Sequence, residues 1–378
     1  MAAPGRNWEK WTPWIVAGLL TLLAVIHAGR HGGDFPTYWR AAGRFLHGAP
    51  LYPASDGLNT YRYSPGVLLF LAPLAAMPLP VAKALWFALL VATGWWVARR
   101  LVTLIPGPGA GRAVLIGFVG VSRPFLDGFF YAQVDVLVLG LVVMAFVAEN
   151  RGRDGLAGAM IAMAGGLKLA PFLFALDFAL RRRWRALGGV AAGVASLAAI
   201  PIATYGLSGT VDVHVEWFHS LRTSAAGLVG SQDNQGIFGI VAHLAPATPD
   251  GRLPPGPATW LAFAAAAGVV AWALRSRFPY PRRALLLFAL AEAAPLGWMW
   301  NFVTAWPALS LLARSGTWIA WAVGTYGILT LLAIYDVVGP RVETWIFIRS
   351  LPGFPLLAFF LLASLVRTPE PERSGLPG

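Results

Sequence analysis

The sequence predicts an all-α polytopic membrane protein with about 12 transmembrane helices. Three observations support this fold class. Hydrophobic residues make up 57% of the 378 residues and charged residues only 12%, whereas a soluble domain carries roughly a quarter charged residues. Apolar stretches recur along the chain at lengths that suit membrane helices. Short groups of Lys and Arg separate these stretches, as the positive-inside rule expects of cytoplasmic loops.

The first apolar stretch, 12–29, has a basic head but no clear small-residue cleavage site, so we interpret it as a retained helix rather than a signal peptide. Two later stretches are interrupted, 64–98 by Pro78 and Pro80, and 155–180 by Lys168 and Pro171. The remaining apolar stretches are 113–122, 131–148, 186–204, 257–274, 284–297, 301–313, 317–335 and 352–366.

The basic groups predict how the chain folds back. For the arginines of 151–153 and 181–185 to share one side, 155–180 must cross twice, with its turn near Lys168 on the outer side. The same reasoning gives 64–98 one crossing, with 64–77 as a short broken or re-entrant piece. We therefore expect one integral membrane domain, 1–366, with outer loops at about 30–63 and 205–256 and both ends in the cytoplasm. The Pro-rich segment 367–378 is expected to be a disordered cytoplasmic tail.

Charge and cysteine content exclude several classes of protein. The net charge of +12 is accounted for by cytoplasmic loops, and no basic run interleaved with aromatic residues indicates a nucleic-acid partner. The chain has no Cys, so disulfides, thiolate metal sites and a Cys nucleophile are excluded. Ten of the 17 acidic residues fall on the predicted outer side or at its edge. Acidic residues barely direct topology, so this clustering reflects either polar loops or a carboxylate-bearing site.

Residues 35–47 alternate apolar and basic side chains at helical spacing, which predicts an amphipathic helix in the membrane interface after the first crossing. Asp34 stands directly before this helix, and Pro36 lies in its first turn. Two roles for Asp34 are open at this point, a helix N-cap and a catalytic carboxylate, and they do not exclude each other.

Several short motifs occur in a fixed order with characteristic spacing. They are Asp34-Phe-Pro-Thr-Tyr-Trp, Gly48-Ala-Pro-Leu-Tyr52, Tyr61-Arg-Tyr-Ser-Pro65, Tyr131-Ala-Gln133-Val-Asp135, Ala157-Gly158 followed by Lys168-Leu-Ala-Pro171, Asn234-Gln235, and Pro295-Leu-Gly-Trp298. Together they resemble glycosyltransferase family 87, whose members belong to the GT-C superfamily and use polyprenyl-phosphate sugars. The likeness covers roughly residues 10 to 310.

This resemblance implies a GT-C fold and an inverting transfer of a sugar, with mannose expected and arabinofuranose as the alternative, to a lipid or glycan acceptor. Asp34 corresponds to the catalytic aspartate, the general base that such a reaction needs. The leaving phosphate needs fixed cations, for which Lys168, Arg62 and Arg123 are the candidates. Lys168 could instead snorkel to the surface, and Arg123 could be an interfacial anchor. Residues expected to bind substrate are Tyr38, Tyr63, Gln133, Asp135, Asn234, Gln235, Trp298 and Asn301.

The expected partners are the lipid-linked donor, the acceptor and membrane lipids, with no metal or other cofactor. The expected location is a prokaryotic plasma membrane, with the active site facing outward. The family's His residues after its last Trp motif are absent here, because the sequence continues Trp298-Met-Trp300-Asn301. Two rival interpretations therefore stay open, a lipid or sugar transporter without chemistry and an inactive partner of an envelope complex. If Asp34 is not the base, Asp56, Asp127 and Glu292 are the next candidates.

Overall fold

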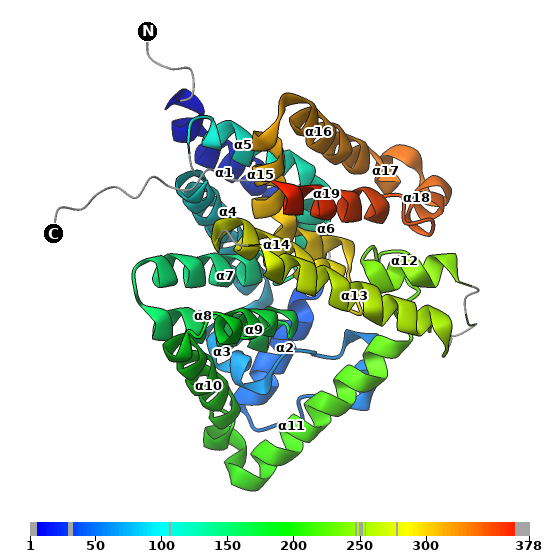
Figure 1. Ribbon diagram of the computed structural model, residues 1–378. Coiled ribbons are helices and arrows are strands. Elements are labelled where there is room, and N and C mark those ends of the chain that lie inside the picture. The colour runs from blue at the N-terminus through cyan, green and yellow to red at the C-terminus, as the bar shows by residue number, and fades with distance from the viewer. Residues whose placement is uncertain are drawn as a thin grey trace, which may run out of the picture.

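The computed structural model describes residues 6–28, 33–105, 107–245, 248, 252–253, 255–276 and 279–366, and within these residues the chain is helical without any strand (Figure 1). Its α-helices are α1 Arg6–Ala28, α2 Phe35–Leu46, α3 Leu68–Ala75, α4 Leu79–Leu104, α5 Ala110–Gly120, α6 Ser122–Phe130, α7 Asp135–Asn150, α8 Asp154–Leu167, α9 Leu173–Leu180, α10 Trp184–Ala199, α11 Ile202–Ala226, α12 Ile237–Leu244, α13 Pro257–Arg275, α14 Pro279–Glu292, α15 Trp306–Ser315, α16 Thr317–Leu332, α17 Tyr335–Val338, α18 Pro340–Phe347 and α19 Gly353–Leu365. Short 3-10 turns are η1 Ala54–Asn59, η2 Pro65–Val67, η3 Ala170–Phe172 and η4 Met299–Ala305. The expected disordered tail, 367–378, lies outside the described residues.

One end of the helix bundle is held by buried ion pairs. Glu149 at the end of α7 pairs with Arg181, which directly follows α9. Arg183 lies 3.4 Å from Asp154, the first residue of α8. The beginning of α8 and the end of α9 therefore meet at this end, with Lys168 at the far end of the hairpin that they form. This arrangement agrees with the fold-back predicted for 155–180.

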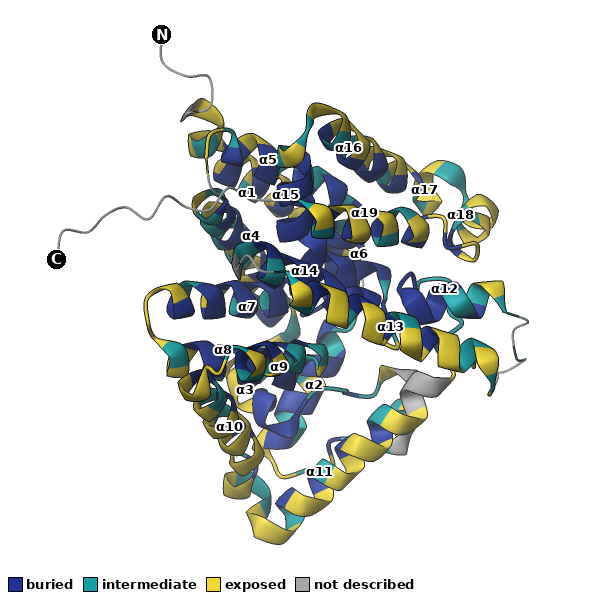
Figure 2. Cartoon of the chain, in the orientation of Figure 1, coloured by how far each residue is buried: buried dark blue, intermediate teal, exposed yellow. Residues whose placement is uncertain are grey.

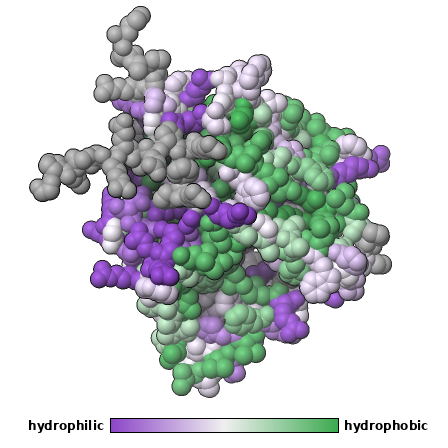
Figure 3. All heavy atoms as spheres, in the orientation of Figure 1, coloured by the Kyte–Doolittle hydropathy of each residue, from purple (hydrophilic) through white to green (hydrophobic). Residues whose placement is uncertain are grey.

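Two further arginines join this end, because Arg282 and Arg283 at the beginning of α14 form ion pairs with Asp177 and Glu149. Glu9 and Lys10 of α1 line a groove together with Arg99 and Thr103 of α4. Figure 3 shows hydrophilic side chains concentrated where α7 and α8 meet, and hydrophobic side chains over much of the rest of this face. Such a division is typical of a membrane protein, because the hydrocarbon region excludes charge.

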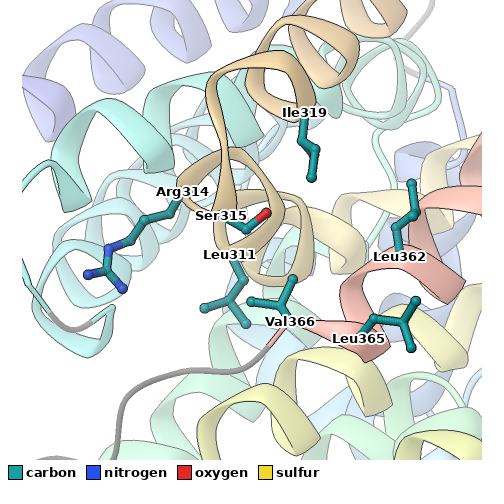
Figure 4. Close-up of a pocket in the computed structure, with 7 residues that line it drawn as sticks. All are labelled: Leu311, Arg314, Ser315, Ile319, Leu362, Leu365 and Val366. Carbon is teal, nitrogen blue, oxygen red and sulfur yellow. The ribbon is translucent and has the colours of Figure 1, made fainter.

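A small apolar groove lies between the end of α15 and the end of α19, lined by Leu311, Ile319, Leu362 and Leu365 (Figure 4). The guanidinium of Arg314 extends away from these side chains toward the loop before α5. A Cβ on Gly107 would come within 2.4 Å of Arg314 Nη2. Within the described residues, the groove is therefore an apolar contact between helix ends, and the Arg314 guanidinium lies toward Gly107.

The number of membrane crossings stays a prediction. Among the described residues, three helices are long and apolar enough to span a membrane, or up to five if two bent pairs each count as one span. Five further apolar helices have 10–17 residues. The apolar helices support a polytopic membrane protein, but they do not confirm about 12 crossings.

Residues 35–47 form the expected helix, with α2 ending at Leu46. Phe35, Tyr38 and Phe45 on one face of α2 are buried, and this helix packs on α3. The short pieces η2 and α3 agree with the prediction that 64–77 is broken. The burial of α2 fixes its position within the molecule, whereas a position in the membrane interface stays a prediction.

The segment 205–256, predicted to be an outer loop, contains a long helix that the sequence analysis did not identify. α10 and α11 are bent by 96° at a short break, so that α11 turns away from α10 and runs along the lower edge of the molecule toward α13 (Figure 1). Leu207, Val211, Val215 and Phe218 are exposed along it at helical spacing, while Trp217 is buried on the other face (Figure 2). This amphipathic pattern is typical of a helix that lies in the membrane interface.

Small residues bring α8 and α10 into close contact. A Cβ on Gly158 would lie 1.9 Å from Ala186 O, and a Cβ on Gly189 would lie 2.1 Å from Gly155 O. Backbones approach this closely only where no side chain intervenes, as is common between membrane helices. This contact supports the helix that presents Lys168.

Candidate active site

A cavity of about 980 Å³ lies at the end of the bundle opposite the buried ion pairs. It is bounded by α2, the beginnings of α7 and α9, part of α11, the end of α14 and η4. Predicted site residues from distant parts of the chain line it, namely Asp34, Tyr38, Arg62, Tyr63, Gln133, Asp135, Lys168, Trp298 and Asn301. Three other predicted residues, Arg123, Asn234 and Gln235, are absent from its described lining.

Asp34 occupies the N-cap position of α2, but its side chain makes no capping hydrogen bond. Its Oδ2 instead accepts a hydrogen bond of 2.6 Å from Gln133 Nε2. The backbone N–H of Asp34 donates to Tyr131 O at 2.9 Å. Gly33 permits this approach, because it has φ +50° and a Cβ would come within 2.3 Å of the Tyr131 backbone. The carboxylate therefore points into the cavity, as a reacting group requires.

The surroundings of Asp34 make it a stronger base than an exposed aspartate. Burial raises the pKa of the Asp34 carboxyl above its ordinary value, while the hydrogen bond from Gln133 and the charges of Arg62 and Lys168 oppose the rise. A raised pKa favours proton uptake from an acceptor group. The cations keep the carboxylate available in its ionised form.

Lys168 is held inside the cavity. Its Nζ donates to both carboxylate oxygens of Asp135, at 2.7 and 2.8 Å, and to Asn301 Oδ1 at 2.7 Å. Asp135 is buried at the beginning of α7, and Asn301 lies in η4. These contacts argue against a lysine that merely snorkels to the surface. They make Asp135 and Asn301 positioning residues for the ammonium group.

Two clusters of aromatic side chains line the cavity. Tyr38 and Tyr63 share a hydrogen bond of 2.9 Å between their hydroxyl groups. On another wall, the rings of Trp298 and Trp300 stack in parallel with centroids 5.0 Å apart, and Tyr131 packs against Trp300 at 4.8 Å. Rings of this kind offer flat apolar faces with polar edges, which suit sugars as well as lipids.

Arg123 has a structural role in this conformation. It donates to Asp127 at 2.9 Å, to Glu343 at 2.8 Å and to the backbone oxygen of Ala333 at 3.2 Å, and thereby joins α6 to the segment around α18. The expectation that Arg123 binds the donor phosphate gains no support from this placement. We therefore leave Arg123 out of the proposed site.

Asn234 and Gln235 are also structural. Asn234 Nδ2 donates to the backbone oxygens of Val229 and Pro295, and Gln235 Nε2 donates to that of Phe347. Both side chains are completely buried. They fix the loop that carries Asp233 instead of facing the cavity. Their expected role as direct ligands of substrate is thus unsupported.

The other candidate bases are less suitable than Asp34. Asp56 forms a two-pronged ion pair with Arg44, and Asp127 is bound by Arg123. Glu292 is fully buried and is not among the described residues of the cavity lining. None of the three therefore presents an available carboxylate to the cavity.

Sequence reasoning missed Asp233, Tyr131, Trp217 and Trp300 as lining residues. Asp233 directly precedes the Asn234-Gln235 motif, which was the available signal. Burial raises the pKa of Asp233, Arg123 opposes the rise and Glu343 adds to it. Among the described residues, no group of three or more His, Cys, Asp or Glu side chains is placed to hold a metal. The absence of a cofactor stays a prediction.

Comparison with known proteins finds one matching family model and several similar proteins. The family model described as Glycosyltransferase family 87 matches residues 61–300. A Mycobacterium tuberculosis polyprenol-phosphate-mannose-dependent alpha-(1-2)-phosphatidylinositol mannoside mannosyltransferase is 28% identical over 75% of this chain and 70% of its own length. A Mycolicibacterium smegmatis protein of the same name is 30% identical over 61% of this chain and 58% of its own length. No solved structure matches this chain significantly.

Proposed function

We propose, since the chain belongs to glycosyltransferase family 87, that it transfers mannose from a polyprenyl phosphate to a lipid or glycan acceptor with inversion at the sugar's first carbon. The names of its relatives specify a polyprenol-phosphate-mannose donor and phosphatidylinositol mannoside acceptors. The observation that carries the proposal for this chain is the orientation of the Asp34 side chain. Its carboxylate does not cap α2 but accepts a hydrogen bond from Gln133 and points into the cavity.

In the proposed reaction, Asp34 removes the proton of an acceptor hydroxyl while that oxygen attacks the first carbon of the sugar. The bond from this carbon to the phosphate oxygen breaks, and its electron pair stays on the departing polyprenyl phosphate. Attack from the face opposite the leaving group inverts the configuration. Lys168 and Arg62, the cations of the described cavity lining, stabilise the charge that develops on the phosphate.

The apolar part of the cavity suits the lipid portion of the donor. Leu173 and Leu176 of α9, Leu221 of α11 and Leu290 of α14 contribute to the lining. A polyprenyl chain in contact with these side chains would place its phosphate near Lys168 without leaving an apolar environment. We propose that this end of the bundle faces outward, because the basic loops gather at the opposite end.

The direct test is to incubate the purified protein in liposomes with polyprenyl-phosphate mannose and phosphatidylinositol mannosides, and to identify products by mass spectrometry. An acceptor that gains one hexose supports the proposal. Movement of the donor between leaflets without a glycosylated product would support a flippase instead. Donor binding without either outcome would indicate an inactive partner.

A further inference from the structure

An aromatic and acidic wall, formed by Tyr131, Asp233, Trp298 and Trp300, lies beside Asp34 in the cavity. Its backbone is fixed by an antiparallel bridge between Asn234 and Trp298 and by the hydrogen bond from Met299 N to Asp233 O at 2.9 Å. The carboxylate of Asp233 and the ring of Trp298 are thus held on neighbouring segments. The wall is assembled before any substrate arrives, which reduces the entropy lost on binding.

The Asp233 carboxylate is not used by the protein itself. No side chain in the described ranges donates a hydrogen bond to it or forms an ion pair with it. Arg123, whose charge lowers the pKa of Asp233, donates its hydrogen bonds to Asp127 and Glu343. A half-buried carboxylate with unfilled acceptor positions is costly unless a ligand supplies donors.

Groups of opposite charge contribute to the cavity lining, the cations Arg62 and Lys168 and the carboxylate of Asp233. The charges of Arg62 and Lys168 lower the pKa of Asp34, whereas the charge of Arg123 lowers the pKa of Asp233. A phosphate is favoured beside Arg62 and Lys168 and repelled by Asp233. The end at Asp233 therefore suits a neutral ligand rich in hydroxyl groups. Tyr131 joins the two ends, since its backbone binds Asp34 and its ring packs on Trp300.

The wall has the chemistry that recognises a pyranose ring. A carboxylate accepts hydrogen bonds from two adjacent hydroxyl groups, and an indole face packs against the apolar C–H face of the sugar. Trp298 is half-buried and Trp300 is buried, both line the cavity, and their rings stack on each other.

We propose that Asp233 and Trp298 form the subsite for the acceptor, a neutral hexopyranoside whose attacking hydroxyl they direct toward Asp34. This assignment rests on the proposed function. It adds that the wall formed by Asp233 and Trp298 binds the acceptor rather than the donor. Asp233 binds two hydroxyl groups of the acceptor ring, and Trp298 packs on its apolar face. The donor phosphate occupies the opposite end.

The test compares Asp233→Asn, Trp298→Ala and a control, Asp212→Asn, in transfer from polyprenyl-phosphate mannose. Asp212 is an exposed carboxylate on α11 outside the described cavity lining. Loss of a charge-assisted contact in Asp233→Asn should raise the acceptor KM by about tenfold or more, and loss of the packing surface in Trp298→Ala should raise it as well. The donor KM should stay unchanged, and Asp212→Asn should match the wild type. A rise in donor KM, or an unchanged acceptor KM, would overturn the assignment.

A second measurement keeps this test separate from the proposed function. Saturation-transfer NMR with methyl α-mannoside reports binding without turnover. The wild type and Asp212→Asn should give a signal that Asp233→Asn lacks. Equal signals from all three proteins would overturn the subsite. A wild type that binds the mannoside through Asp233 but makes no product would support the subsite and contradict the proposed transfer.

Discussion

Asp34 illustrates how a residue with an evident structural role can serve another purpose. An aspartate at an N-cap normally accepts a hydrogen bond from the second or third residue of the helix. Asp34 is in that position but accepts from Gln133 instead. The helix therefore forgoes one stabilising contact, which is typical of a residue whose side chain is needed elsewhere.

Asp34→Asn is expected to preserve folding and donor binding while lowering turnover at least about a hundredfold, the low end for loss of a general base. Asparagine has nearly the same shape and lacks the basic oxygen pair. The measurement is kcat together with donor affinity and melting temperature. Asp56→Asn is a suitable control, because Asp56 is paired with Arg44 away from the described lining. Near-normal turnover in Asp34→Asn would place the base elsewhere.

The pH profile should reveal the environment of Asp34. Only the ionised carboxylate acts as a base, so activity falls as pH decreases through its pKa. Because burial raises that pKa, the acid limb of kcat/KM should lie above the range of an ordinary aspartate, about 3.9. Gln133→Leu removes a hydrogen bond that lowers the pKa, so the acid limb should move to still higher pH. A shift to lower pH would contradict this role, provided that activity recovers when neutral pH is restored.

Lys168 requires a more careful substitution, because Asp135 is buried and paired with it. Replacing Lys168 alone leaves an uncompensated carboxylate, which typically costs 3–5 kcal/mol. We expect Lys168→Met to lower both stability and donor use. Adding Asp135→Asn should restore most of the stability but not the donor KM, measured by thermal unfolding and kinetics. Recovery of donor use in the double variant would mean that Lys168 serves only to neutralise Asp135.

At the scale of helices, the sequence predicted positions better than contacts. The boundaries of α2 and the break near Lys168 followed from helical spacing, from glycine and from proline. The helix α11 was missed, because Asp212, His214 and Glu216 make this segment appear to be a polar outer loop. Leu207 and Val211, which are exposed and four residues apart on that helix, have the spacing of one helical face. This spacing in the sequence would have predicted an amphipathic helix.

The contact between α8 and α10 offers a test with adjacent positions. Gly189→Ala places a Cβ 2.1 Å from Gly155 O, whereas a Cβ on Gly188 meets nothing within 4 Å. Gly189→Ala should separate the helices, lower the melting temperature and weaken donor use through Lys168. Gly188→Ala should be neutral or stabilising by up to about 1 kcal/mol, since alanine favours helices over glycine. Equal melting temperatures for the two variants would contradict this packing.

At the scale of the molecule, the site is assembled from residues that no local pattern connects. Gln133 lies 99 positions from Asp34, and Asn301 lies 133 positions from Lys168. Motif order indicated the segments, but the fold decides which side chains face the cavity. Asn234 belongs to such a segment but donates its hydrogen bonds to the protein's own backbone, whereas the adjacent Asp233 faces the cavity. Arg123, a candidate from outside the motifs, also binds its own protein. Residue type alone cannot distinguish a side chain that binds substrate from one that supports the fold. The same polar groups also form hydrogen bonds with buried backbone groups.

The arrangement of the whole bundle makes a prediction about its orientation. Basic side chains gather at one end and the cavity lies at the other, so the positive-inside rule places the cavity outside the cytoplasm. Because the chain has no Cys, single cysteines can be introduced without background. Ser55 near the cavity end and Arg185 near the basic end are both exposed. In intact cells, a membrane-impermeant maleimide should label Ser55→Cys but should label Arg185→Cys only after permeabilisation. Labelling of Arg185→Cys in intact cells would reverse the orientation, and the donor sugar would then have to be supplied from the cytoplasmic leaflet.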